Sequence, residues 1–109
     1  MKYEIIEKTL KLDGKEIKFK YSIEKLVEFE DMYVLLLTEN KLPHNNVIAI
    51  DRDGVILWHI EDIKKFPRLN IYVGLWKEND RQIGVISFSG FEMIIDVYTK
   101  EIIRHEMTK

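Results

Sequence analysis

The sequence predicts an all-β fold: an antiparallel meander of about 8–10 strands, in a strongly bent sheet or in two packed sheets. Apolar and polar residues alternate over several short segments, turn residues recur at regular spacing, and no segment of convincing length has helical periodicity. A chain of 109 residues favours a single domain, 1–109, with one core. Its expected parts are an N-terminal hairpin (about 4–23), a first meander (about 25–61) and a second meander (about 70–107).

The first expected element is a hairpin around the turn Asp13-Gly14. Leu10 then lies opposite Ile17 on one face, and Lys11 opposite Glu16 on the other, so both faces agree on one register. Continued outward, this register gives three further pairs: Ile6 with Tyr21, Glu7 with Lys20, and Lys8 with Phe19.

A second hairpin is expected next, with Glu30-Asp31 as its turn. Met32 to Thr38 is too short and too β-prone for a helix of its own. The continuous apolar run from Val34 to Leu37 predicts a strand buried on both faces, at the centre of the sheet. Residues 39–45 are polar and contain Pro43, which is typical of a loop.

The hairpin 46–61 is the element from which the sheet is expected to grow. Two runs rich in β-branched residues flank Asp53-Gly54, a dipeptide that readily takes the positive φ angles of a type I′ turn. Residues 63–69 are expected to be a loop or a single helical turn. The second meander then follows, with strands near 70–77, 82–88, 91–97 and 101–107 joined by short turns.

The two meanders echo each other. When the sequence is aligned with itself so that Asp51 falls on Asp96, residues 49–51 match residues 94–96. With one inserted residue at Lys100, residues 56–57 match residues 102–103, and His59 matches His105. A repeat of this length is in the range of a four-stranded propeller blade. Two blades do not close a ring, so we expect two propeller-blade-like repeats that pack as bent or stacked sheets beside the N-terminal hairpin.

The sequence of 47–58, Val-Ile-Ala-Ile-Asp-Arg-Asp-Gly-Val-Ile-Leu-Trp, resembles the blade motif of quinoprotein-like propeller repeats. In that motif a strand ends in Asp, turns through Gly and continues into a strand that carries Trp. The whole chain resembles small uncharacterised all-β proteins of low-GC Gram-positive bacteria, some of which look like immunity partners of polymorphic toxins. This resemblance rests on the Asp-Gly-Trp hairpin and the closing strand pair 96–109, and it implies neither a quinone nor catalytic residues.

Composition narrows the function classes. Hydrophobic residues at 46% and charged residues at 33% are typical of a soluble globular protein and not of a disordered one. The formal net charge of -2 gives no field that would recruit nucleic acid or an anionic membrane. The chain has no cysteine, and its first residues lack the apolar core of a signal peptide, so we expect a cytoplasmic protein.

Residues of metal-binding type have a simpler structural explanation. The run from Asp51 to Gly54 begins like a calcium loop, but the further ligands and flanking helices of an EF-hand are missing. Its aspartates are therefore expected to bond the backbone of a turn. Zinc would need three or four convergent ligands, and the only imidazoles are those of His44, His59 and His105.

Residues of catalytic type are equally unspecific. Ser87 and Ser89 lack the spacing of a nucleophile elbow, and turn chemistry explains them. In a chain with 19 acidic residues, acid pairs such as Asp51 with Glu61 carry little information. The basic residues of 64–68 are expected to form a solvated loop. We therefore predict no catalytic residues, no metal and no cofactor.

Large aromatic residues concentrate in the second half, where a thin sheet has little room to bury them all. Tryptophan and tyrosine are favoured anchors at protein interfaces. Later strands also carry little charge, so the expected interface combines both features: Trp58, Trp76, Ile83, Val85, Phe88 and Phe91. For each of the two tryptophans a place in the core is the alternative.

These observations predict a non-catalytic protein that binds another protein, with immunity to a toxin as the specific form that the resemblance suggests. An acidic surface would suit a basic nuclease as the target. The acidic residues near the centre of the chain are Glu28, Glu30, Asp31, Glu39, Asp51, Asp53, Glu61 and Asp62. Two alternatives stay open: a small-ligand or carbohydrate-binding module with Trp58 or Trp76 as a stacking platform, and a structural protein that completes its sheet by homo-oligomerisation.

Overall fold

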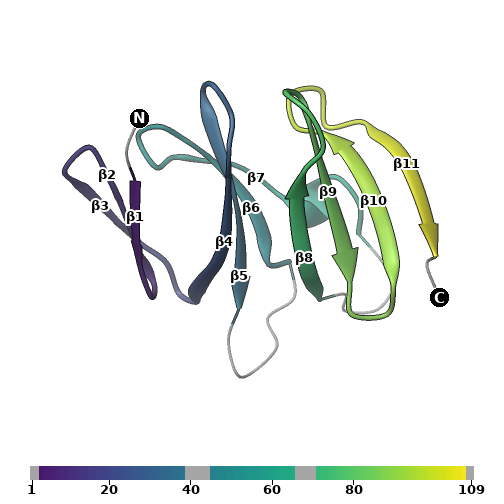
Figure 1. Ribbon diagram of the computed structural model, residues 1–109, viewed down its shortest axis with the longest axis horizontal. Helices are drawn as coiled ribbons and strands as arrows, with labels where there is room; N and C mark the ends of the chain where they lie inside the picture. Colours follow the sequence, from purple (N-terminus) through teal and green to yellow (C-terminus); the bar gives the residue numbers. More distant parts are fainter. Residues whose placement is uncertain (1–2, 39–44, 66–70, 108–109) are drawn as a thin grey trace.

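The computed structural model describes residues 3–38, 45–65 and 71–107, which form eleven short strands in three antiparallel sheets. The predicted all-β class is confirmed. In this part of the chain the helical structure is limited to the three-residue 3-10 helix η1 (Ile60–Asp62), and none of it is long and apolar enough to span a membrane. The three sheets follow one another in chain order across the molecule (Figure 1).

Each sheet is a meander in which neighbours in sequence are neighbours in space. The N-terminal sheet consists of β1 (Tyr3–Ile6), β2 (Thr9–Leu12) and β3 (Lys15–Lys18). The middle sheet consists of β4 (Ser22–Glu28), β5 (Met32–Thr38), β6 (Val47–Asp51) and β7 (Ile56–His59). The C-terminal sheet consists of β8 (Tyr72–Lys77), β9 (Gln82–Ser87), β10 (Phe91–Asp96) and β11 (Ile102–Met107), close to the four strands expected there.

The N-terminal hairpin is in fact a three-stranded sheet. Glu7 has a positive φ of 53°, and the chain turns back there so that Ile6 pairs with Thr9. The two inner pairs of the expected register are confirmed, Leu10 with Ile17 and Lys11 with Glu16. The two outermost expected pairs, Ile6 with Tyr21 and Glu7 with Lys20, are wrong. They do not form because the turn at Glu7 folds β1 back onto β2.

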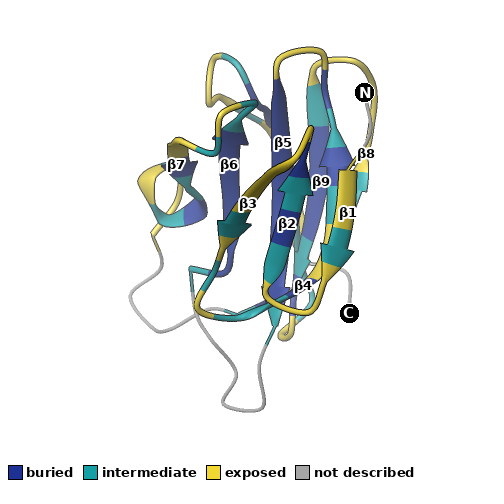
Figure 2. Ribbon diagram, turned by 90° about the vertical axis from the view of Figure 1, so that its left-hand side faces the viewer, coloured by how far each residue is buried: buried dark blue, intermediate teal, exposed yellow. Residues whose placement is uncertain are grey.

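The middle sheet is buried on both faces, as the apolar run in β5 predicted. Val34 and Leu36 pack in one hydrophobic cluster with the C-terminal sheet. Tyr33 and Leu35, which alternate with them, pack in a second cluster with the N-terminal sheet. Figure 2 shows β5 and β6 as continuously buried strands in the interior. The molecule therefore has three layers and two cores, whereas a single core was expected from the length of the chain.

A buried amide joins the middle and C-terminal sheets. Asn46 is 3% exposed, and its Nδ2 donates to the carbonyl oxygens of Leu37 at 2.9 Å and Tyr72 at 2.8 Å. Its Oδ1 accepts a hydrogen bond from the Tyr72 N–H at 3.0 Å. Every polar atom of this side chain is thus bonded, which is the condition for burying an amide without loss of stability.

The turn of the organising hairpin differs from the expected type I′ turn. The Gly54 N–H donates to the Asp51 carbonyl at 3.1 Å, so the turn is centred on Arg52-Asp53, and Gly54 follows it with a φ of 90°. The cause is the Asp51 carboxylate, which accepts hydrogen bonds from the N–H groups of Asp53 and Val55 at 2.8 and 2.9 Å. By contrast, Asp13 and Gly14 both have positive φ, as a type I′ turn requires.

The echo between the two meanders has a structural counterpart in this turn. Asp96 ends β10 as Asp51 ends β6, and its carboxylate accepts the N–H groups of Tyr98 and Thr99, both at 2.9 Å. Lys100, the inserted residue, takes the left-handed position with a φ of 66°. In both sheets an aspartate therefore fixes the turn between the third and fourth strands.

Gly54→Ala is expected to destabilise the protein more than Gly14→Ala. Both glycines have positive φ, so each alanine strains the backbone by about 1 kcal/mol. At Gly54 the new Cβ would also lie 2.7 Å from Ile17 Cδ1 in the N-terminal sheet, whereas at Gly14 it meets open space. Urea unfolding of the two variants measures the difference, and equal losses would mean that the turn does not pack on Ile17.

Candidate protein-binding surface

Stacking three sheets leaves two outer faces. On the N-terminal sheet the outward residues are largely charged: Glu4, Ile6, Thr9, Lys11, Glu16 and Lys18. On the C-terminal sheet, paired residues share a face, and the row of Leu75, Val85 and Met93 belongs to the core. The rows on either side of it therefore point outward. They form what we call the C-terminal outer face: Trp76, Gly84, Ile86 and Ile94, with Glu92, Arg104 and Glu106.

Trp76 dominates this face. It lies opposite Gly84 in the pairing of β8 with β9, and a Cβ on Gly84 would overlap the indole ring, so the ring occupies the space above the glycine. The indole Nε1 donates to Glu78 Oε1 at 2.9 Å, which fixes the ring's orientation. Ile94, the next residue along this row, is only 4% exposed although it points away from the core. Trp76 is thus partly exposed and held in place.

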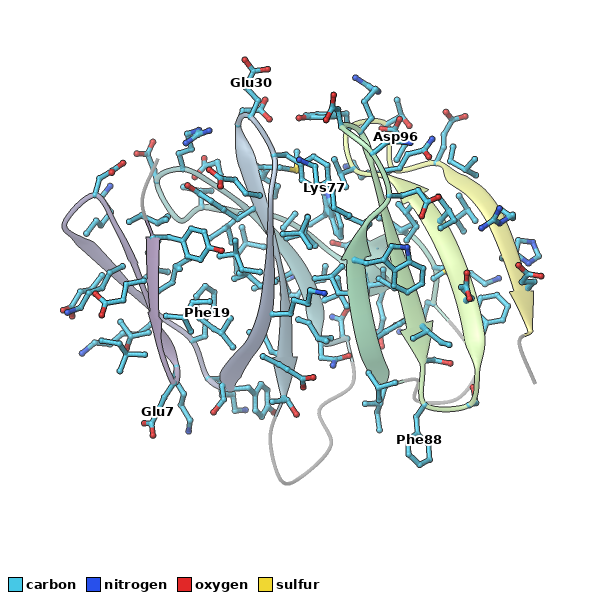
Figure 3. The ribbon with its side chains drawn as sticks, in the orientation of Figure 1. Glu7, Phe19, Glu30, Lys77, Phe88 and Asp96 are labelled. Atoms are coloured by element: carbon cyan, nitrogen blue, oxygen red, sulfur yellow. The ribbon has the colours of Figure 1, made fainter. Side chains whose placement is uncertain are left out.

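The rim of the C-terminal sheet carries further exposed apolar side chains. Phe88 is 76% exposed in the turn between β9 and β10 and projects away from the body of the molecule (Figure 3). Val73 and Ile103 are 47% and 50% exposed, each next to a register shift in its edge strand. Exposed apolar side chains around an aromatic residue are typical of contact surfaces.

Three of the six expected interface residues are buried and belong to the core. Ile83 and Val85 are fully buried because they alternate with Gly84 and Ile86 and point inward. Trp58 is 3% exposed, and its Nε1 donates to the Val97 carbonyl at 3.2 Å. The expectation that these side chains lie on a surface is therefore wrong.

The other three expected residues keep accessible surface. Phe91 is partly buried against the core, and its ring stacks on that of His105 with centroids 5.7 Å apart. Phe88 is the most exposed of the six, and Trp76 is partly exposed. The sequence-based prediction did not include Gly84 and Ile86. Both alternate along β9 with the inward residues Ile83 and Val85, and this alternation could have placed them on the outer face.

The two serines weighed as a nucleophile serve the turn between β9 and β10. Ser87 and Ser89 bond each other through their hydroxyl oxygens at 2.9 Å, and Ser87 Oγ accepts the Phe91 N–H. Among the described residues no group of three or more His, Asp or Glu side chains is placed to hold a metal ion. His44 and Arg68 lie outside the described residues.

Asp96 is the acidic residue with the most perturbed environment. Burial disfavours its charged form, but the N–H groups of Thr99 and Tyr98 and the Arg81 guanidinium outweigh this effect and lower the pKa of the carboxyl below its usual value. Arg81 Nε lies 3.2 Å from Asp96 Oδ2. The guanidinium also lies 4.7 Å above the Tyr98 ring, whose hydroxyl donates to Asp31. This network joins the ends of the middle and C-terminal sheets.

Asp96→Asn should destabilise the protein by about 1–3 kcal/mol at neutral pH, because the variant keeps the hydrogen-bond acceptor but loses its charge. Because the pKa of Asp96 is lower in the folded protein than its ordinary value of 3.8, the ionised carboxylate stabilises the fold at pH values above 3.8. This stabilisation is lost as the pH falls below 3.8 and through the folded-state pKa. The difference between wild type and variant should therefore shrink in acid. Urea midpoints measured across this range test it, and a difference independent of pH would contradict it.

The model of a family described as a domain of unknown function, DUF7957, matches residues 1–107. No curated protein shows significant similarity to the chain. Because the match covers nearly the whole sequence, the chain belongs to the DUF7957 family.

Proposed function

We propose that this protein is a non-catalytic binding domain that docks another protein on its C-terminal outer face. The observation that carries the proposal is the position of Trp76, partly exposed on this face beside Gly84 and Ile94, with the charged residues of β10 and β11 next to this apolar part. Protein interfaces have this anatomy, with aromatic anchors at the centre and a polar rim. The outward face of the N-terminal sheet offers no comparable aromatic anchor among the described residues.

Immunity to a toxin is the specific form that we propose, supported by the resemblance of the Asp-Gly-Trp hairpin. The acidic residues do not favour a strongly basic target. Asp53 lies in the β6–β7 turn, but Lys15 is 3.6 Å from its carboxylate, and Arg52 Nε donates to the Glu30 carbonyl in the neighbouring turn. Glu61 and Asp62 lie at the other end of β7, in η1. Because these acidic residues lie at different ends of β7, they do not support a single acidic patch. We therefore propose a contact of mixed charge on the C-terminal outer face.

The alternative of a carbohydrate-binding module has less support. Trp58 is buried and offers no stacking platform. Trp76 covers Gly84 with its ring, which leaves at most one ring face for a sugar. For the compartment, we propose the cytoplasm, because a chain without cysteine gains nothing from an oxidising environment.

The partner to test is any toxin-like protein whose gene lies beside the gene of this protein, and Trp76→Ala and Ile86→Glu are the variants. Each should weaken binding about tenfold or more in calorimetric titration, because each removes an apolar contact from the centre of the face. Ile6→Glu is the matched control, since Ile6 is 47% exposed on the outward face of the N-terminal sheet. It should bind as wild type does.

Circular dichroism must show that the variants keep the wild-type fold. If folded Ile86→Glu binds normally while Ile6→Glu does not, the contact lies on the opposite side of the molecule and the proposed surface is wrong. If no neighbouring product binds the wild type, the immunity form is excluded.

A further inference from the structure

Among the strands that the structure describes, β11 forms an open edge of the C-terminal sheet. It pairs there with β10 alone, and Figure 1 shows it as the last strand on its side of the molecule. After the register shift opposite Ile94 and Ile95, β11 runs regularly from Arg104 to Met107. Such an edge presents backbone N–H and C=O groups that can pair with another strand.

The side chains of β11 carry charges of alternating sign on one face. Arg104 and Glu106 both point to the C-terminal outer face, and their side chains are 60% and 56% exposed. Their own ion pair is long, with Nε and Oε1 4.0 Å apart. Glu92 of β10 lies directly opposite Glu106, and like charges in this position destabilise a sheet. A cation beside Glu106 would therefore be favourable.

We propose that β11 pairs antiparallel with β11 of a second copy, about a twofold axis that passes through His105. In this register Arg104 of each copy lies opposite Glu106 of the other, so two pairs of opposite charge form. Each Arg104 also lies beside the Glu92–Glu106 pair of the other copy. Registers centred on Arg104 or on Glu106 would instead place like charges opposite each other.

This arrangement has a consequence for binding. A twofold axis perpendicular to the sheet keeps the two outer faces on the same side, so the dimer joins both C-terminal sheets into one and presents two C-terminal outer faces side by side. The inference goes beyond the proposed function. A monomer could still bind a partner through Trp76, and a dimer could form without one, so the two proposals fail independently.

Charge reversal tests the register. Arg104→Glu and Glu106→Arg each turn two attractive pairs into two repulsive ones, so sedimentation equilibrium should show dimer dissociation constants raised about tenfold or more. The double reversal, Arg104→Glu with Glu106→Arg, exchanges the charges and should restore the wild-type constant. Lys18→Glu makes the same charge change as Arg104→Glu on the N-terminal sheet and should have no effect.

A single introduced thiol gives a second readout, because the chain has no cysteine. His105→Cys places one thiol of each copy at the axis, so mild oxidation should produce a covalent dimer. Val73→Cys, on the opposite edge strand β8, should stay monomeric. A wild type that sediments as a monomer at every concentration, or a folded double reversal that fails to restore the dimer, overturns the proposal.

Discussion

Leu35→Ala and Leu36→Ala should each destabilise the protein by about 2–5 kcal/mol, although the two side chains point to opposite faces of β5. Leu35 is fully buried against the N-terminal sheet, and Leu36 is 1% exposed against the C-terminal sheet. In a two-layer protein one of these neighbours would face solvent, and its truncation would cost little. Equal, large losses are the signature of a middle layer.

The outer layer provides the control for this experiment. In β9, Val85→Ala removes a buried side chain, whereas Ile86→Ala removes one that points outward and is only partly covered. Urea unfolding should therefore show a large loss for the first and a clearly smaller one for the second. If Leu35 or Leu36 tolerates alanine as Ile86 does, the middle sheet has an open face and the three-layer arrangement is wrong.

Asn46→Ala should also cost about 2–5 kcal/mol, because it leaves buried partners without hydrogen bonds. The Tyr72 N–H and the carbonyl oxygens of Leu37 and Tyr72 all bond the Asn46 side chain. These bonds tie the end of β5 to the start of β8, so their loss should loosen the contact between the middle and C-terminal sheets.

The adjacent residue supplies a matched control. Asn45 Oδ1 accepts one hydrogen bond, from the Glu61 N–H at 2.9 Å, at a partly exposed position. Asn45→Ala should therefore cost about 1 kcal/mol. Thermal unfolding of the two alanine variants compares the positions, and similar losses would show that the buried amide does not link the sheets.

Local patterns in the sequence were sufficient for the four strands of the C-terminal sheet and for one of the hairpin turns. Asp13-Gly14 forms the expected turn, and the apolar run in β5 is buried on both faces. The third strand of the N-terminal sheet was not predictable, because Glu7 turns the chain between β1 and β2 with a positive φ that a non-glycine residue rarely adopts. No local pattern indicates such a residue.

The partial error in the predicted surface has a related cause. Register shifts occur between Ala49 and Ile50, opposite the strand of Trp58, and between Tyr72 and Gly74, in the strand of Trp76, and each shift changes which residues share a face beyond it. Sequence parity alone therefore does not separate a core tryptophan from a surface one. Trp58 points into the core, whereas Trp76 covers a glycine on the outside.

The two tryptophans permit a direct test of binding at the C-terminal outer face. In nuclear magnetic resonance spectra each indole N–H gives its own signal, and the buried Trp58 serves as an internal control for Trp76. When a protein partner that binds the wild type is added, the Trp76 signal should shift while the Trp58 signal stays in place. A complex in which the Trp76 signal does not move would contradict docking on this face.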